Sequence, residues 1–148
     1  RSVAEPFLKT GLELATSDSD AFDAVVASFR LPRETDEDKG KRRDAIRLAT
    51  LGAAEVPYQT ATSALQLLRL LPELAAKGNP NAASDVGVSA LLASAALKGA
   101  IFNVEINLQS LPPEMGVEMR ENLVNLIEEG RVYSRMSMDA VRERLANS

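Results

Sequence analysis

One stretch, from Gly78 to Leu108, is apolar or small at nearly every position, and it constrains the fold more than any other part of the chain. A helix that is apolar on all sides must be buried by its neighbours. Along this helix the heptad spacing predicts a stripe of ordinary core residues. A solvent-facing strip is expected only at Ser94, Lys98 and Glu105. The expected core stripe comprises Val88, Leu92, Ala95, Gly99, Phe102 and Ile106.

A second stripe of the same helix carries small and amide side chains. Small side chains allow another helix to approach closely. The two asparagines of the stripe, Asn103 and Asn107, lie one turn apart and offer hydrogen bonds that an apolar core does not need. The pattern therefore predicts a close helix contact with a polar end. The stripe comprises Ser89, Ala93, Ala96, Ala100, Asn103 and Asn107.

A chain of 148 residues is expected to form one domain, because this length buries most of its apolar surface in a single core. It is rich in alanine and has only four phenylalanines and two tyrosines, which favours helices over sheets. No segment shows the alternation of a strand. We predict an all-α fold: a single-domain helical bundle over residues 1–148 with a buried central helix over Asp85–Gln109. Two further helices are expected at residues 114–129 and 137–145, with a weak point at Gly130.

The first part of the chain is expected to hold two short helices, at residues 2–16 and 20–29. The polar cluster Ser17–Asp20 separates them, because such residues can end one helix and cap the next. In the second of these helices, Phe22 and Phe29 are expected to face the core.

Capping residues predict the ends of the longer helices. Thr35, followed three residues later by Asp38, resembles a capping box and predicts that a helix begins directly after Thr35. Pro57 is expected to kink or break that helix. Gly78 is well placed to end it, and Ser84 is expected to be the N-cap of the central helix.

The chain contains neither cysteine nor histidine, and both absences restrict its chemistry. Without cysteine there are no disulfides and no thiolate ligands, and without histidine the usual general base at neutral pH is missing. Proton transfer would have to use carboxylates, lysine or tyrosine, and no bound metal is expected. The net charge of −4 argues against nucleic acid as a partner, since phosphate neutralisation needs a basic surface.

The longest apolar run, Val86–Leu97, is interrupted by two serines and closed by Lys98. A membrane-spanning helix needs about 20 predominantly apolar residues. No signal peptide opens the sequence. We therefore expect a cytoplasmic protein without a membrane partner.

Two motifs, GNPNAASD at residues 78–85 and NVEIN at residues 103–107, resemble the formiminotransferase-cyclodeaminase family. Single-domain bacterial members of that family are often described as methenyltetrahydrofolate cyclohydrolases. Three upstream segments follow the family's order, so the resemblance covers essentially the whole chain: Asp20-Ala21-Phe22, Leu31-Pro32 and Glu55-Val56-Pro57. The family normally opens with a helix bearing a Pro-Gly-Gly-Gly-Ser turn, which this sequence does not contain. The chain resembles a family member without that first helix.

The resemblance implies one-carbon chemistry on a tetrahydrofolate derivative. In the cyclodeaminase reaction, N10 of 5-formiminotetrahydrofolate attacks the formimino carbon and ammonia leaves, which gives 5,10-methenyltetrahydrofolate. In the cyclohydrolase reaction, water attacks the methenyl carbon and 10-formyltetrahydrofolate results. Either reaction needs a base for the attacking group and an acid for the leaving nitrogen, each worth about 10² to 10⁴ in rate. Neither needs a metal or a redox cofactor.

Two carboxylates are candidates for this proton transfer. Asp85 comes first, because it is the carboxylate inside the GNPNAASD motif. The alternative is that it only stabilises the helix dipole from the first turn, by roughly 0.3 to 1 kcal/mol. Glu55, close before Pro57, is the second candidate, and its alternative is an ordinary exposed helix position.

Other residues are candidates for binding the folate. Asn79, Asn81 and Ser84 can hold the pterin or the p-aminobenzoyl amide, although turns are rich in Asn and Ser for backbone reasons alone. Arg43, with Arg47 four residues later, can meet the anionic glutamate tail. The alternative for this basic run is a solvated face that the preceding acidic residues neutralise.

Asp85 and Asn103 are separated by 18 residues, or roughly 27 Å of ideal helix, so one small site cannot use both directly. Either Asn103 and Asn107 serve packing or the far end of an elongated folate, or a second subunit brings its own stripe beside the site. The chain is expected to form a homodimer or a larger assembly.

A competing hypothesis is a non-enzymatic helical dimerisation or scaffold domain. In that case the small-residue stripe is a subunit contact and the polar motif only caps a helix. Adding methenyltetrahydrofolate and following its near-ultraviolet absorbance distinguishes the two hypotheses.

Overall fold

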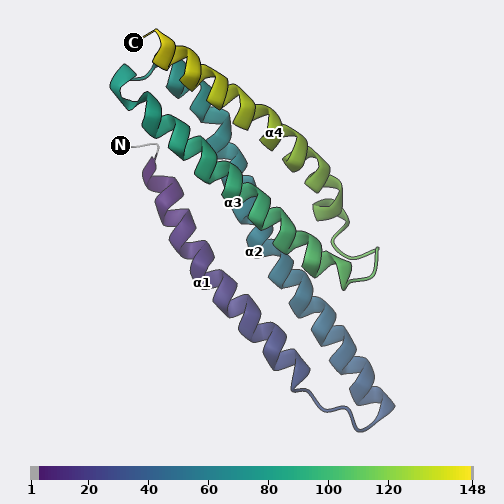
Figure 1. The fold of residues 1–148 in the computed structure, drawn as a ribbon. Coiled ribbons are helices and arrows are strands. Elements are labelled where there is room, and N and C mark those ends of the chain that lie inside the picture. The colour runs from purple at the N-terminus through teal and green to yellow at the C-terminus, as the bar shows by residue number, and fades with distance from the viewer. Residues whose placement is uncertain (1–3, 148) are drawn as a thin grey trace. The chain divides into compact units, whose positions relative to one another are not determined.

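The structure, a computed structural model, describes residues 4–147. Four long helices and one 3₁₀ turn make up most of these residues, and no strand occurs among them (Figure 1). The predicted all-α fold is confirmed. The elements are α1 (Ala4–Phe29), α2 (Asp36–Lys77), η1 (Pro80–Ala82), α3 (Ala83–Gln109) and α4 (Val117–Ala146).

The chain divides into two compact units, each assembled from segments that are distant in sequence. Unit 1 consists of Arg1–Gln59 and Phe102–Arg120, and unit 2 of Thr60–Ile101 and Glu121–Ser148. Unit 1 therefore contains α1, the first part of α2 and the end of α3. Unit 2 contains the remainder of α2 and α3, the turn η1 and most of α4.

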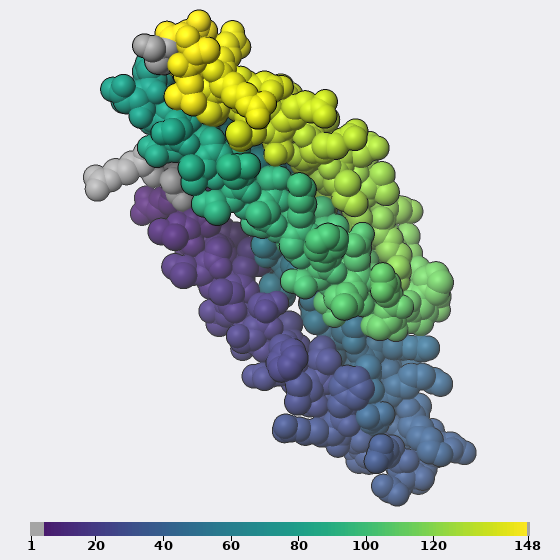
Figure 2. All heavy atoms as spheres, in the orientation of Figure 1, coloured from purple at the N-terminus to yellow at the C-terminus, as the bar shows by residue number. Residues whose placement is uncertain are grey.

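In unit 2, α3 and α4 lie side by side (Figures 1 and 2). A small residue permits close approach between them, because a side chain at Gly87 of α3 would meet Val141 of α4 at 3.3 Å. The second half of α2 contributes leucines to the same core. Buried core residues of this unit include Leu65, Leu68, Leu71, Ala90, Ala93, Leu97, Leu126 and Val141.

Helix α4 is continuous, whereas two helices with a weak point at Gly130 are expected from the sequence. A side chain at Gly130 would collide with the end of the Leu97 side chain of α3. The glycine therefore allows α3 and α4 to pack closely, and α4 continues through it. Next to it, Glu129 pairs with Arg69 of α2 at 2.6 Å. Both side chains are partly solvated, so this ion pair adds little stability.

In unit 1, two arginines bind backbone carbonyls at helix ends. Arg42 of α2 donates from Nε and Nη2 to the carbonyl of Phe29, the last residue of α1, at 3.3 and 3.1 Å. Its guanidinium also lies 5.5 Å from the centre of the Phe29 ring. Arg120 donates to the carbonyl of Leu108 in the last turn of α3 and to that of Leu111, which follows the helix. Helix C-termini leave carbonyls without intrahelical partners. The two arginines bind such carbonyls, Arg42 at the end of α1 and Arg120 at the end of α3.

Only one side of α3 is buried, which corrects the expectation of a helix surrounded by neighbours. Val88, Leu92, Phe102 and Ile106 belong to the expected core stripe, yet they are between 55% and 69% exposed. Ser94, which is expected to face solvent, is buried. Hydrophobic periodicity identifies apolar positions, but it cannot show which of them a neighbouring helix covers. The buried side comprises Val86, Ala90, Ala93, Leu97, Ile101, Val104 and Leu108.

By length and composition, one helix among residues 4–147 is long and apolar enough to cross a membrane. It spans Pro80–Gln109, and its most apolar window has a mean hydropathy of 1.5. The apolar stretch is therefore longer than the run Val86–Leu97 that the sequence suggests. A core helix of a bundle passes the same test, and 44% of this window is buried inside the protein. The absence of a membrane partner stays a prediction.

Helix α1 runs through the polar cluster Ser17–Asp20, so the expected break there is wrong. Thr16 and Ser17 donate their hydroxyls to the carbonyls one turn earlier, at 3.4 and 3.0 Å, and thus remain inside the helix. Phe22 and Phe29 are also exposed, at 66% and 54%, and do not face a core.

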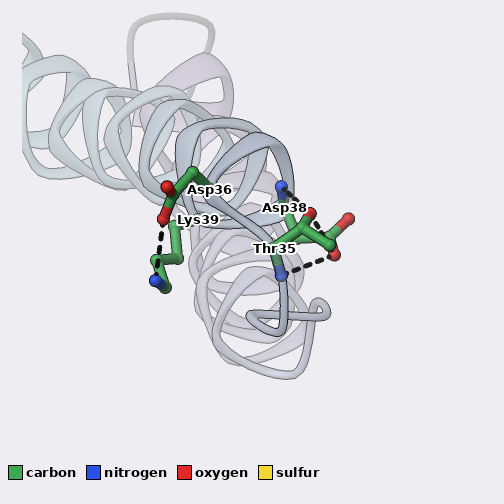
Figure 3. Close-up of polar contacts among 4 residues, drawn as sticks. All are labelled: Thr35, Asp36, Asp38 and Lys39. Carbon is green, nitrogen blue, oxygen red and sulfur yellow. Dashed lines mark hydrogen bonds and ion pairs between the residues drawn. The ribbon is translucent and has the colours of Figure 1, made fainter.

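Helix α2 begins as predicted, directly after Thr35. The backbone N–H of Thr35 donates to Oδ2 of Asp38 at 3.2 Å, and the N–H of Asp38 donates to Oγ1 of Thr35 at 3.1 Å (Figure 3). This reciprocal pair is a capping box in which Asp replaces Glu or Gln. In the same turn, Lys39 pairs with Asp36 at 2.9 Å (Figure 3).

The later course of α2 agrees only in part with the sequence-based prediction. The helix continues for 42 residues through Pro57 and Pro72, so Pro57 does not break it. Its end is as predicted, because the N–H of Gly78 donates to the carbonyl of Leu74 at 2.8 Å. A side chain at Gly78 would collide with that carbonyl, so glycine suits this position.

We expect Thr35→Ala to lower the free energy of unfolding by about 1 kcal/mol, because it removes the N-cap hydroxyl that accepts the Asp38 N–H. Thr35→Ser retains the hydroxyl and should stay close to the parent. Urea denaturation with an unchanged m-value measures both changes. Equal stability of the two variants would contradict a role of this cap in the fold.

Candidate functional site

The GNPNAASD segment forms the turn η1 and the first turn of α3, in unit 2. Asn79 has an extended backbone (φ −61°, ψ 123°), as expected before Pro80, and its Oδ1 accepts the N–H of Asn81 at 3.1 Å. Asn79 is therefore the N-cap of this segment. The expected N-cap, Ser84, lies instead at the second position of α3, because the 3₁₀ turn leads directly into the helix. Part of the polar motif thus serves the backbone.

Asp85 lies in the first turn of α3 and is exposed. Within residues 4–147 its carboxylate makes no hydrogen bond and no ion pair, while its backbone carbonyl accepts the hydroxyl of Ser89 at 2.8 Å. The side chain is therefore accessible to a ligand. It also lies at the positive end of the helix dipole, so the position suits both of its expected roles.

Glu55 is exposed on α2, in unit 1, two residues before Pro57, which changes the backbone hydrogen bonds of this part of the helix. Proline has no N–H, so the carbonyl of Ala53, four residues earlier, loses its intrahelical donor. The side chain of Asn107 on α3 provides a substitute: its Nδ2 donates to the Ala53 carbonyl at 3.5 Å, a long hydrogen bond. The Glu55-Val56-Pro57 and NVEIN segments are thereby brought together.

The two asparagines of the NVEIN motif differ in environment. Asn107 is partly buried and donates also to the carbonyl of Asn103 at 2.9 Å, so both of its contacts are to backbone. Asn103 is exposed. Of the alternatives considered for this pair, packing accounts for Asn107, and Asn103 keeps a side chain accessible to solvent.

Arg43 lines a basic cavity of about 450 Å³ in unit 1. The sequence singles out Arg43 and its neighbour Arg47, but it does not reveal that residues of the α1–α2 connection and of the segment after α3 join them. Only the basic run from Lys39 to Arg43 hints at such a site. We name this feature the basic cavity and define it by its lining residues: Arg33, Lys39, Arg42, Arg43, Ile46, Arg47 and Ser110.

The candidate residues thus fall into two groups. The group in unit 2 consists of Asn79, Asn81, Ser84 and Asp85, and the group in unit 1 consists of Arg43, Glu55, Asn103 and Asn107. Among residues 4–147, no group of three or more His, Cys, Asp or Glu side chains is arranged to hold a metal ion. Each group offers carboxylate, amide, hydroxyl or guanidinium side chains for acid–base or binding chemistry.

Comparison with known families gives a match over most of the chain. The family model described as formiminotransferase-cyclodeaminase matches residues 2–125. This match includes both the GNPNAASD and the NVEIN motifs.

Individual relatives agree with the family match. The chain is 32% identical to the methenyltetrahydrofolate cyclohydrolase of Methylorubrum extorquens, over 96% of this chain and 69% of that protein. It is 30% identical to the formimidoyltransferase-cyclodeaminase of Sus scrofa, over 99% of this chain and 28% of that protein. The crystal structure of formiminotetrahydrofolate cyclodeaminase from Thermotoga maritima is similar with a TM-score of 0.71 and 25% identity, over 97% of this chain and 66% of that one. The chain spans about two thirds of these bacterial relatives and about a quarter of the mammalian one.

The contact between Asn107 and the Ala53 carbonyl gives a test of the local geometry. Asn107→Ala should lower the free energy of unfolding by about 0.5 to 1.5 kcal/mol. In a Pro57→Ala background the same change should cost less, because the new backbone N–H at position 57 supplies the missing donor. A double-mutant cycle by urea denaturation measures this coupling.

Asn103→Ala is the matched control, since it removes an exposed amide one turn away. It should show no coupling to Pro57→Ala. If Asn107→Ala costs the same with and without Pro57, the two residues do not interact as described.

Proposed function

The chain belongs to the formiminotransferase-cyclodeaminase family, and we propose that it acts on a tetrahydrofolate derivative. Two reactions fit: conversion of 5-formiminotetrahydrofolate to 5,10-methenyltetrahydrofolate with release of ammonia, or hydrolysis of 5,10-methenyltetrahydrofolate to 10-formyltetrahydrofolate. The observation that carries the proposal is the family match over residues 2–125, together with relatives whose names are cyclohydrolase and cyclodeaminase.

Asp85 is the proposed acid or base. The chain has no histidine, so a carboxylate that is accessible and without a cation partner is the best available group for proton transfer. Asp85 meets both conditions within the described residues, and it lies in the motif that carries the family resemblance. Glu55 is the second candidate, because it too is exposed and lies in a family-like segment.

The folate would be held by polar groups near these carboxylates. Asn81 and Ser84 are exposed beside Asp85 and can bind the pterin or the p-aminobenzoyl amide, while Asn79 keeps its amide N–H groups for a ligand. Arg43 is proposed to meet the glutamate tail. Asn103 is proposed for the far end of an elongated folate, and Asn107 can contribute only its amide oxygen there, because its Nδ2 donates to two backbone carbonyls. No metal or redox cofactor is needed for either reaction, and we propose a cytoplasmic enzyme.

A second part of the proposal is a homodimer. The exposed side of α3 presents Val88, Leu91 and Leu92, which are 55%, 57% and 67% exposed. Exposed apolar groups at heptad spacing are typical of a surface that another helix covers. A second copy of the chain, packed through the same side of α3, would bury them in a self-complementary contact.

The proposed activity is tested by following the near-ultraviolet absorbance of methenyltetrahydrofolate. In a chain that carries the family's glycine-rich first helix, Asp85→Asn should fold normally and lose on the order of 10² to 10⁴ in rate. A helix-dipole role would cost only about 0.3 to 1 kcal/mol of stability and leave turnover intact. Asp139→Asn, at an exposed position of α4, is the matched control and should keep the parent's rate.

Turnover of Asp85→Asn within a few-fold of the parent would remove Asp85 from the mechanism and move attention to Glu55→Gln. Absorbance that decays no faster than in buffer, with formiminotetrahydrofolate also unchanged, would support the non-enzymatic alternative.

The dimer is tested with a charge on the exposed side of α3. Leu92→Glu should shift the protein from dimer to monomer at micromolar concentration, because a carboxylate would be buried without a partner in the contact. Leu74→Glu places the same charge on α2, at a leucine that is 52% exposed, and should leave the assembly unchanged. Sedimentation equilibrium measures both. A parent protein that is monomeric at this concentration contradicts the proposal.

A further inference from the structure

We propose that the basic cavity of unit 1 binds a small anion that carries two or more negative charges. Five of its seven lining residues are cationic, and no carboxylate is among them within the described part of the chain. Its volume of about 450 Å³ lies within the range of ligand pockets, roughly 300 to 1,000 Å³, and well above that of a single ion.

The acidic residues before the cavity neutralise its lining only in part, although the sequence suggests that they neutralise the whole basic run. Asp38 belongs to the capping box with Thr35, and Glu37 pairs with Lys41 at 2.6 Å, outside the lining. These two carboxylates are thus engaged elsewhere.

Two other carboxylates do reach lining residues. Asp36 pairs with Lys39 at 2.9 Å, and Asp44 lies 3.5 Å from Nε of Arg43 and 3.9 Å from Nη1 of Arg47. One carboxylate shared between two guanidinium groups at these distances leaves an excess of positive charge.

The wall of the cavity is held in place. Arg42 is anchored on the Phe29 carbonyl and ring, which fixes the lining to the end of α1. Arg43 and Arg47 lie one turn apart on α2, so their side chains emerge on the same face. Guanidinium groups bind carboxylate and phosphate through paired N–H donors. Two of them at this spacing suit a ligand with two neighbouring anionic groups better than one with a single charge.

Two sources of such a ligand share this chemistry: a chain of γ-linked glutamates and an oligophosphate. The first would extend the proposed function, in which Arg43 meets the tail of a folate, and in that form the inference rests on it. The binding itself is measured without any pterin, so a failure here and a failure of the catalytic proposal are separate results.

Isothermal titration calorimetry at constant ionic strength tests the inference, with γ-linked triglutamate and tripolyphosphate as probes. Arg43→Gln/Arg47→Gln should weaken binding of the preferred probe on the order of tenfold or more, since it removes charge-assisted hydrogen bonds. The matched control is Arg131→Gln/Arg135→Gln, which removes two exposed arginines at the same spacing from α4. It should bind like the parent.

Binding of triglutamate alone assigns the cavity to a carboxylate chain, and binding of tripolyphosphate alone assigns it to phosphate. Binding of both probes supports a general site for multiply charged anions. The inference is overturned if neither probe binds the parent, if the two double variants weaken binding equally, or if free glutamate and phosphate bind as tightly as the oligomeric probes.

Discussion

The burial of α3 is the constraint on which the rest of the structure depends. This helix is apolar on two sides, and each large aliphatic side chain that becomes buried contributes roughly 1.5 to 3 kcal/mol. One side packs at heptad spacing against its neighbours, and Gly87 and Gly130 let α4 come close to it. The other side keeps Leu91 and Leu92 in solvent. The same sequence pattern therefore builds the core and supplies the surface on which the proposed dimer rests.

Much of the polar chemistry of the chain is used to complete helix backbones. Thr35 and Asp38 satisfy the start of α2, Asn79 caps η1, and Arg42 binds the last carbonyl of α1. Asn107 does the same in a helix interior, where Pro57 leaves a carbonyl without a donor. A polar residue in a family-like motif is thus not a ligand by default. The side chains left for function are those that the backbone does not occupy.

The sequence predicts the helices better than it predicts what covers them. The start of α2 and the cap at Gly78 follow from local chemistry that a few neighbouring residues decide, and both predictions are confirmed. The break at Ser17–Asp20 is wrong because hydroxyls can bond one turn back and stay helical. Burial of Phe22 and Phe102 also fails, since periodicity identifies an apolar face and cannot show whether another helix of the chain reaches it. The basic cavity depends on Ser110, more than sixty residues from Arg47, which no local pattern reveals.

The lack of histidine makes the surroundings of each carboxylate decisive for the chemistry. A carboxylate that is already paired with a lysine or arginine is less available to contact a substrate. Asp36, Asp44 and Glu129 are in that situation, since each lies within 4 Å of a lysine or arginine nitrogen. Asp85 and Glu55 have no such partner within residues 4–147. Asp85 lies in the first turn of α3, close in sequence to the exposed polar side chains of Asn81 and Ser84. This position is why we propose Asp85 ahead of Glu55 for the proton transfer, since a substrate that meets its carboxylate can also meet these polar groups.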